Sequence, residues 1–416
     1  MSGTRRTRPA ALLLAALLLF GAGAPAGAGA EAAEEPALTE TAEAACAPML
    51  RAGGSFVWAV REDGSILGWG DNRMGQLGTT PCRILLNPVP AADGLTGGEL
   101  ADIQCGNENT LFLKKDGTVY TCGTYSRGTQ GLGPLDAVVR TPTRIPELTG
   151  IVQISCGFGH NAALDRDGHI WIWGRNDAGQ LGLGDRTARN RPERLPLEGI
   201  VSVNCGGKFT LAQDREGTLW GWGANTHQVL AAGKKTAYTE PIRLEGFEGK
   251  TITAFSGGSD CAFWLDDSGT LWTRGRNEFK QLGSAAAAWK VSPELTTVDI
   301  PEKVRTVCAY SAATAALTES GNVWLWGSVS AGQLGNGEAP GASLPVQVWD
   351  GGDAAEIAMG SLMSCVRTAD GRIYVSGYNK YGQLGNGGKK SSRTWVWNGT
   401  SVLGTEEEQA SEELNR

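Results

Sequence analysis

The sequence predicts an all-β protein, a seven-bladed β-propeller built from seven repeats of about 51 residues. Two observations support this prediction: a turn glycine recurs every 49 to 53 residues, and each repeat holds short strand-like runs with no segment of helical periodicity. The turn glycines are Gly64, Gly117, Gly168, Gly217, Gly269, Gly321 and Gly371. Short strands repeated at this period are typical of a propeller, whose blades bury their faces against their neighbours.

The clearest repeat shows how the four strands of one blade are expected to follow one another. Residues 152–156 alternate apolar and polar side chains, which indicates a strand with one buried side. A second strand runs through Leu164 to an Asp-Gly turn at Gly168, and residues 170–173 form the third. A longer loop leads to the segment 192–196, which begins with proline and therefore belongs on the outer edge of the sheet.

The alternating strand directions divide the connections between two faces. The loop after the first strand and the loop after the third strand lie on one face, and the tight Asp-Gly turns lie on the other. The first face therefore carries the more variable segments, whereas the second carries repetitive turns.

The first thirty residues have the composition of a signal peptide. A stretch with three arginines precedes an apolar run over residues 10–20 and an Ala-x-Ala site at 28–30. The apolar run of eleven residues is shorter than the roughly 20 that a spanning helix needs. We therefore expect cleavage after Ala30 and export of the protein; a retained amphipathic anchor is the alternative.

The remaining chain divides into a propeller at 46–404, an acidic Ala-rich linker at 31–45 and an acidic tail at 405–416. The formal net charge is −7, which argues against nucleic acid as a partner because phosphate binding requires a basic face. No later apolar run is long enough to insert into a membrane.

Nine cysteines leave at least one without an intramolecular partner. Four of them precede the repeat's first glycine slot, a position that we expect to hold small, buried, unpaired side chains: Cys105, Cys156, Cys205 and Cys308. A metal-binding ring of thiols is the alternative, but zinc ligands occur at close spacing and these lie about fifty residues apart, so no metal site is predicted. Cys46 and Cys82 break the repeat and are the pair for a disulfide if one forms.

The motif Gly-Gln-Leu-Gly occurs at 75–78, 179–182, 332–335 and 382–385. Together with the x-Cys-Gly, Asp-Gly and Trp-x-Trp-Gly elements, it resembles the regulator of chromosome condensation repeat family. The resemblance implies one of three functions: nucleotide exchange on small GTPases, association with chromatin or, as in secreted bacterial members, inhibition of β-lactamases. Export and acidity argue against the first two. The sequence carries no inhibitor-specific motif.

The loops after the first strands carry the candidate partner-binding residues, which follow the repeat's glycine slot: Phe56, Phe158, His160, Phe209, Tyr310 and Met363. Apolar rings at one mouth of a propeller are typical of protein-binding anchors. The alternative is that they fold back over the tops of the blades, and the resemblance implies that His160 stabilises its turn. The Trp-x-Trp-Gly residues could stack on sugars, but packing between blades explains their fixed position better.

Four polar residues are expected to face the central channel: Asp102, Gln153, Arg305 and Glu356. Arg305 and Glu356 lie on neighbouring blades and form the charged pair expected there. Such a pair could serve an enzyme, a lyase or hydrolase, at the channel mouth, or it could be a satisfied ion pair in a wet channel.

We therefore expect a secreted, monomeric, non-enzymatic propeller without a cofactor, which binds a protein partner through loops on one face. An enzyme at the channel mouth and an exchange factor, the latter by family analogy alone, are the alternatives. Neither the partner nor the place where the ring closes follows from the sequence.

Overall fold

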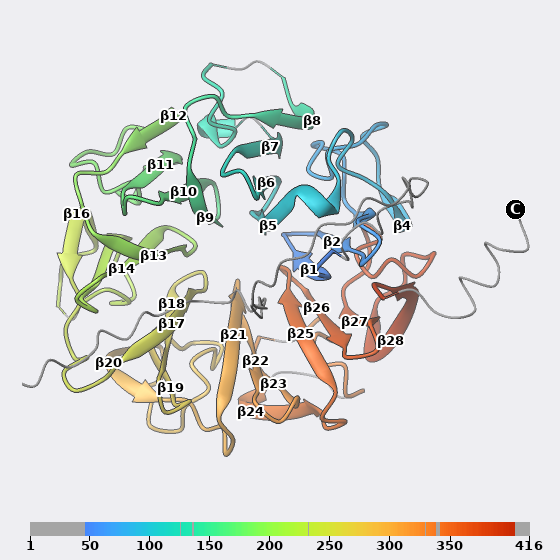
Figure 1. Cartoon of the computed structure of the whole chain (residues 1–416). Coiled ribbons are helices and arrows are strands. Elements are labelled where there is room, and N and C mark those ends of the chain that lie inside the picture. The colour runs from blue at the N-terminus through green and yellow to red at the C-terminus, as the bar shows by residue number, and fades with distance from the viewer. Residues whose placement is uncertain are drawn as a thin grey trace, which may run out of the picture. The chain divides into compact units, whose positions relative to one another are not determined.

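The computed structural model describes residues 46–124, 126–134, 137–231, 233–328, 330–337 and 342–403. These residues form seven antiparallel sheets, and the four strands of each sheet follow one another in sequence order. The sheets stand as blades in a ring, numbered here from blade 1 to blade 7 along the chain (Figure 1). The predicted all-β, seven-bladed propeller is therefore confirmed.

The first strand of each blade is the innermost, and the second strand pairs with it. The innermost strands are β1 (Met49–Ala52), β5 (Leu100–Cys105), β9 (Ile151–Cys156), β13 (Ile200–Cys205), β17 (Ile252–Gly257), β21 (Val304–Tyr310) and β25 (Ala354–Met359). The second strands are β2 (Phe56–Val60), β6 (Asn109–Lys114), β10 (His160–Asp165), β14 (Phe209–Asp214), β18 (Cys261–Asp266), β22 (Ala313–Thr318) and β26 (Met363–Thr368). Innermost strands of neighbouring blades contact one another and form the wall of the central channel.

The third and fourth strands extend each sheet outwards. The third strands are β3 (Ile66–Gly70), β7 (Val119–Gly123), β11 (Ile170–Gly174), β15 (Leu219–Ala224), β19 (Leu271–Arg276), β23 (Val323–Gly327) and β27 (Arg372–Gly377). The outer strands are β4 (Leu85–Pro90), β8 (Val139–Arg144), β12 (Arg189–Arg194), β16 (Ala237–Arg243), β20 (Val291–Thr297), β24 (Ala342–Trp349) and β28 (Ser392–Ser401). Two short 3-10 turns, η1 (Gly97–Glu99) and η2 (Ser126–Gly128), complete the described elements. Among the described residues, no helix is long and apolar enough to cross a membrane.

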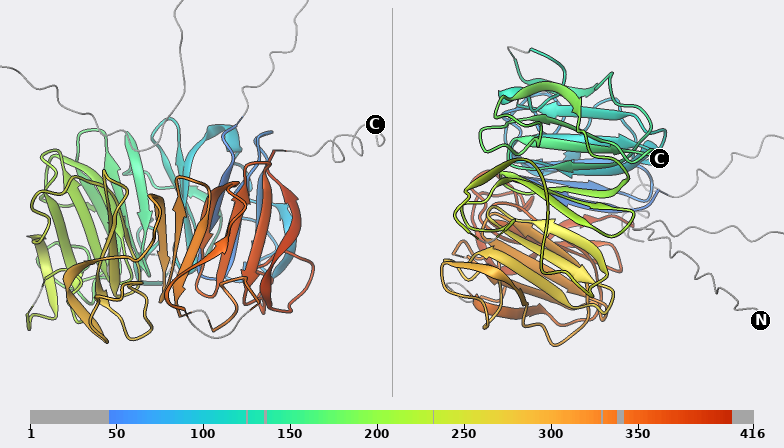
Figure 2. Two further views of the ribbon diagram at one scale, coloured as in Figure 1. Left: turned by 90° about the horizontal axis from the view of Figure 1, so that it is seen from below. Right: turned by 90° about the vertical axis from the view of Figure 1, so that its left-hand side faces the viewer.

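The strands run between two faces of the ring (Figure 2). We call one the loop face, because it carries the loops after the first and third strands of every blade. The other is the turn face, which carries the tight turns between the second and third strands and the connectors between blades. These definitions follow from the observed antiparallel order, as the sequence predicted.

In the clearest repeat, the first three strands lie where the sequence predicted them. The fourth strand, β12, occupies Arg189–Arg194 and therefore begins and ends earlier than the predicted 192–196. A register shift between Ile172 and Gly174 lets Arg189 pair with Gly174, the last residue of β11, so the outer strand begins earlier in the sequence. Pro192 lies in this outermost strand, where its missing N–H removes no ladder hydrogen bond.

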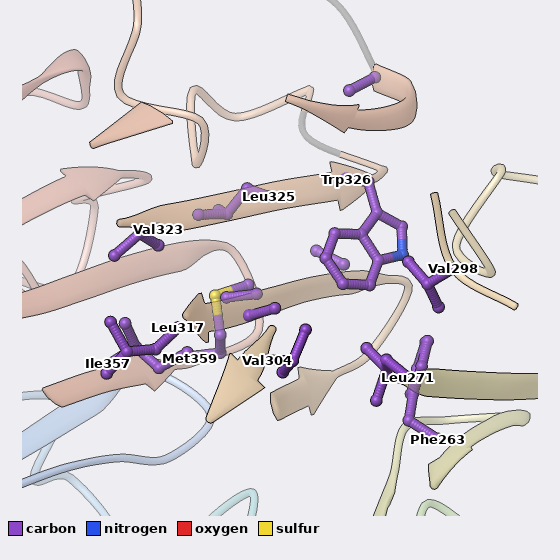
Figure 3. Close-up of a cluster of buried hydrophobic side chains, with 14 of the residues drawn as sticks. Phe263, Leu271, Val298, Val304, Leu317, Val323, Leu325, Trp326, Ile357 and Met359 are labelled. Atoms are coloured by element: carbon purple, nitrogen blue, oxygen red, sulfur yellow. The ribbon is translucent and has the colours of Figure 1, made fainter. Parts of the chain in front are cut away.

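Tryptophans from the third strands fill the spaces between blades. The second tryptophan of the Trp-x-Trp-Gly element is fully buried at Trp173 and Trp326, as expected for packing between blades. The Trp326 indole N–H donates to the Gln281 carbonyl of blade 5 over 2.8 Å, and its ring lies beside Val298 of that blade (Figure 3). Blades 3 and 6 are thus each anchored to the preceding blade by apolar burial and a directed indole hydrogen bond.

The Gly-Gln-Leu-Gly motif shapes the loop after the third strand through two buried amide side chains. In blade 3, Asn176 Oδ1 accepts the N–H of Leu181 over 3.0 Å, and Asn176 Nδ2 donates to the Thr187 carbonyl over 3.0 Å. Gln180 Oε1 accepts the N–H of Ala178 over 2.8 Å. Because the amides satisfy the loop's buried backbone groups, the loop has a defined shape without regular secondary structure.

The ring closes between blades 7 and 1 and not within a blade, since each blade consists of consecutive strands. At this seam β1 lies against β25, and the Leu50 N–H donates to Glu356 Oε2 over 3.0 Å. Backbone hydrogen bonds from Ser361 to Gly54 and from Glu62 to Val402 join the same blades. The seam therefore depends on hydrogen bonds and side-chain packing without a shared strand.

The predicted signal peptide at 1–30, the linker at 31–45 and the acidic tail at 405–416 lie outside the described residues. All nine cysteines are free thiols, including Cys46, which is buried, and Cys82, which is partly exposed. Cys46 and Cys82 therefore form no disulfide in this structure.

Candidate functional site

Four of the six predicted partner-binding residues are buried, which corrects the expectation that they are exposed anchors. Phe56, His160, Phe209 and Met363 share one position, the first residue of the second strand, and none is more than 1% exposed. The side chain at this position covers the glycine three residues before it. A Cβ on Gly206 would lie 2.5 Å from the Phe209 ring, and one on Gly157 would lie 2.5 Å from His160. The alternative interpretation, that they fold back over the blade, is what the structure shows for these four.

His160 serves the contact between two blades. Its Nε2 hydrogen-bonds with Thr210 Oγ1 of blade 4 over 3.0 Å. Burial lowers the pKa of His160 to about 3, so the imidazole is neutral in the folded protein. A neutral, enclosed imidazole with this partner stabilises the structure and is not presented to a partner protein.

Phe158 and Tyr310 come from blades 3 and 6 and meet at the loop-face end of the channel. Their ring centroids are 5.0 Å apart, Tyr310 is buried, and Phe158 is partly buried. Tyr310 occupies the position that glycine holds in blade 3, because it pairs with Ala313 as the last residue of the longer strand β21. This aromatic pair covers part of the channel mouth, so only its outer surface remains available for contact.

The channel holds a cavity of about 540 Å³ lined by the innermost strands. Two predicted channel residues, Asp102 and Glu356, both bind Arg51, with Asp102 Oδ1 at 2.9 Å from the guanidinium. Burial lowers the pKa of Arg51, but attraction to Asp102 and Glu356 outweighs burial and the pKa is raised. Arg51 lay outside the predicted set, although it stands in the innermost strand of blade 1.

The predicted pairing of Arg305 with Glu356 is wrong. Glu356 pairs with Arg51 and with Arg367, whose Nε lies 3.0 Å from Oε2. Arg305 is exposed and donates instead to the Ala355 carbonyl over 2.7 Å. Both predicted carboxylates are therefore counter-ions of arginines, an arrangement that holds charges fixed and does not resemble an acid and base facing a substrate.

Other polar side chains of the channel join neighbouring innermost strands. Gln153 accepts the N–H of Val203 over 3.0 Å and donates to the carbonyl of the same residue over 3.2 Å. Ser155 Oγ accepts the N–H of Cys205 over 2.9 Å. The predicted channel residue Gln153 thus faces the channel wall and links blade 3 to blade 4.

The strand pairing corrects the alignment of one cysteine. Cys105, Cys156 and Cys205 share a position, whereas Cys308 pairs with Ala315 and stands one residue earlier. Cys205 is buried as expected, and burial raises its pKa to about 12. Cys105, Cys156 and Cys308 are partly exposed, which corrects the expectation that all four are buried.

Asp165, Asp167 and His169 bring potential metal ligands close together on the turn face. Asp165 Oδ1 accepts the backbone N–H of both other residues, and its Oδ2 accepts the indole N–H of Trp171. Asp214 makes the same three kinds of hydrogen bond in blade 4, where no histidine stands. The cluster is therefore explained as a repeated turn.

The loop face exposes large apolar side chains that the sequence prediction missed, namely Met74, Phe279, Trp289 and Leu362. Met74 precedes Gly-Gln-Leu-Gly, and Phe279 takes the same position before Lys280-Gln-Leu-Gly283; in both blades the glutamine side chain accepts the backbone N–H of this residue. The same position holds Ala178, Ala331 and Tyr381 in other blades. The sequence signal for this position was a residue type that differs from blade to blade before a motif that recurs. Packing does not determine the side chain there, so a partner could.

Comparisons with known proteins agree with this architecture. A family model described as the RCC1-like domain matches residues 149–412, and the regulator of chromosome condensation (RCC1) repeat matches residues 63–113 and 116–164. The chain is 32% identical over 352 residues to the E3 ubiquitin-protein ligase HERC2 of Homo sapiens, covering 81% of this chain and 7% of that protein. It is 31% identical over 344 residues to the ultraviolet-B receptor UVR8 of Arabidopsis thaliana, covering 82% and 67% of the two chains.

Solved structures show the same fold. Human WBSCR16 superposes with a TM-score of 0.70 at 22% identity, over 82% of this chain and 94% of that one. Prp20p of Saccharomyces cerevisiae superposes with a TM-score of 0.72 at 18% identity, over 88% and 96%. The repeat motifs, the closed ring and these matches together place the chain in the family of RCC1-like repeat propellers.

Proposed function

We propose that this protein is a non-enzymatic propeller that binds a protein partner through its loop face, after export from the cell. The observation that carries the proposal is the exposure of large apolar side chains on the loops of that face. Trp289 is 67% exposed and Phe279 47% exposed, and both belong to the loop after the third strand of blade 5. Neither side chain is needed for packing, so their exposure calls for another explanation.

The surroundings of the two rings suit a protein interface. The Arg276 guanidinium lies 5.1 Å from the Phe279 ring centroid, and the Lys290 ammonium lies 5.0 Å from that of Trp289. Tryptophan is enriched among the residues that dominate binding energies, and a cation beside a ring face is attracted to it. A partner that covers these rings would gain apolar burial from them and charge pairing from Lys290, because Arg276 is already paired with Glu278 and Asp260.

The relatives support a role in protein binding and no single partner. Yeast Prp20p is described as binding Gsp1p and histones, and another yeast structure contains RCC1 bound to Kap60. The chain spans only 7% of HERC2, so the ligase activity of that protein is not transferred to this chain. The proposal of export rests on residues 1–30. If the protein is exported, its partner is another exported protein, which favours an inhibitor-like role over that of an exchange factor.

The enzyme alternative rests on the channel mouth. Asp102 and Glu356 are held by Arg51, so a reaction there would need other groups. We therefore propose a monomer that acts by binding and uses no cofactor.

The test compares partner capture by two matched variants. The full-length protein is immobilised, and proteins retained from culture supernatant of the source organism are identified and quantified by mass spectrometry. Phe279→Ala with Trp289→Ala should weaken the affinity for the principal partner about a thousandfold and so remove it from the retained proteins, because buried aromatic anchors contribute roughly 2 kcal/mol or more each. Trp397→Ala is the control, since Trp397 is 49% exposed on the outer strand β28. Equal retention by both variants would contradict binding through the loop face.

A further inference from the structure

A groove on the turn face of blade 4 lies away from the loop face and has a different chemistry. It has a volume of about 640 Å³ and lies between the turn after β14 and the connector after β16. The side chains of Leu219, Leu244 and Phe247 give it an apolar floor. Leu219 and Leu244 are buried and Phe247 is partly exposed, so the floor belongs to the folded core of the blade.

The wall of the groove is fixed by an arginine that departs from the repeat. Arg274 stands at the position that Trp173 and Trp326 occupy in other blades, directly before the third strand's last glycine. Its guanidinium donates to the Glu245 carbonyl in the groove wall over 3.3 Å and to two carbonyls of blade 4, those of Val229 at 3.1 Å and Leu230 at 2.8 Å. The bond to Glu245 holds the connector of blade 4 against blade 5, and the other two hold the loop after β15.

Arg274 also supports the aromatic part of the floor. The guanidinium lies 5.9 Å from the Phe247 ring centroid, and the Phe247 ring packs edge-on against Trp264 with centroids 5.0 Å apart. Only 4% of Arg274 is exposed, and burial lowers its pKa to about 10. A buried cation bonded to carbonyls, where four other blades have an uncharged tryptophan ring, costs stability. Its role in positioning the groove is a reason for an arginine at residue 274.

The rim of the groove is acidic. Glu216, Glu245 and Glu248 line it and are exposed, and within the described ranges none of their carboxylates forms an ion pair or hydrogen bond. Arg243 is the one cation among the lining residues. Three unpaired carboxylates around an apolar floor are complementary to a segment that carries both positive charge and apolar surface.

We propose that this groove binds a basic segment of a partner protein, in which lysine or arginine residues flank a bulky apolar side chain. The apolar side chain would lie on Phe247, and the flanking ammonium or guanidinium groups would pair with the glutamates. The methylene groups of lysine and arginine would cover the rest of the floor. Because the groove is on the turn face, this site is separate from the proposed loop-face interface and does not depend on it.

The experiment measures binding of one defined probe to the full-length protein. The probe is a short fluorescein-labelled peptide with a central tryptophan between lysines and arginines, followed by fluorescence anisotropy at low and high salt. Glu216→Gln, Glu245→Gln and Glu248→Gln are combined in one groove variant. The matched control combines Glu62→Gln, Glu319→Gln and Asp350→Asn, three exposed acidic residues of the turn face outside the groove.

The groove variant should raise the Kd about tenfold, because each exposed charge pair contributes roughly 0.5 kcal/mol. The control variant should bind like the wild type, and a peptide with glutamine in place of the basic residues should not bind. Equal weakening of peptide binding by the two variants would show that the peptide is attracted to the acidic face as a whole, which would overturn the proposed groove site. Wild-type binding by the groove variant would overturn it as well. The Phe279→Ala, Trp289→Ala variant should bind the peptide normally, which separates this result from the loop-face test.

Discussion

Removal of the Glu356 side chain tests the seam that closes the ring. Glu356 accepts the Leu50 N–H over 3.0 Å and pairs with Arg51 and Arg367. Glu356→Ala therefore takes one acceptor from a backbone N–H and the counter-charge from two arginines. The bonds to Leu50 and Arg51 join the innermost strands of blades 7 and 1, whereas Arg367 belongs to the second strand of blade 7.

The expected loss of stability follows from burial. A hydrogen bond to a charged group contributes roughly 1.5–3 kcal/mol when buried, and breaking a buried ion pair costs roughly 3–5 kcal/mol. The side chain of Glu356 is 20% exposed, and Arg51 keeps Asp102 as a partner, so both values must be reduced. We expect the free energy of unfolding to fall by about 2–4 kcal/mol for Glu356→Ala and by about half as much for Glu356→Gln, which keeps an acceptor for Leu50.

Chemical denaturation at neutral pH, followed by tryptophan fluorescence, measures this change. Glu319→Ala is the control because Glu319 is exposed on the turn face, and its loss should stay within about 0.5 kcal/mol of the wild type. The Arg51→Met, Glu356→Ala double variant should lose less than the sum of the single variants, since the two residues contact each other. A loss below about 1 kcal/mol for Glu356→Ala would refute the view that this network secures the seam.

Three further predictions concern a histidine, the thiols and the N-terminus. Above pH 6.5 His160 is neutral in both the folded and the unfolded chain and does not change the free energy of unfolding. As pH falls towards its folded pKa of about 3, the unfolded chain binds a proton that the folded protein does not, so the free energy of unfolding falls. His160→Phe gives blade 3 the residue that blade 4 has as Phe209. Between pH 7.5 and 4.5 the free energy of unfolding of this variant should therefore fall by about 2–3 kcal/mol less than that of the wild type. Urea midpoints measure the two losses, and identical losses would disprove the prediction. Thiol labelling of native protein should modify Cys205 at least tenfold more slowly than Cys82, with both reacting in denaturant, whereas equal native rates would contradict the burial of Cys205. N-terminal sequencing of the exported protein should begin at Glu31; a chain that starts at Met1 would rule out the signal peptide.

The blades could be predicted from the sequence because turn glycines and alternating strands repeat with the fold itself. The site residues could not, because positions one residue apart in a short loop differ completely in burial. Phe209 stands three residues after its glycine and covers it, whereas Phe158 follows its glycine directly and lies over the channel. The longer strand β21 moved Cys308 and Tyr310 by one position, which only the strand pairing reveals. Likewise, strand alternation predicted that Glu356 faces the channel but not which arginine reaches it.

Departures from the repeat carry the most information about function, because the repeated residues already meet the needs of packing. Phe279 departs in a position that displays its side chain on the loop face, and Arg274 departs in a position that fixes a groove on the turn face. Both belong to blade 5, and Arg274 acts on blade 4, which precedes it. A tryptophan at 274 would bury more apolar area and no charge, so stability alone does not account for the arginine. The two faces of these adjoining blades thus present different chemistries, exposed aromatic rings on one side and an acidic groove on the other.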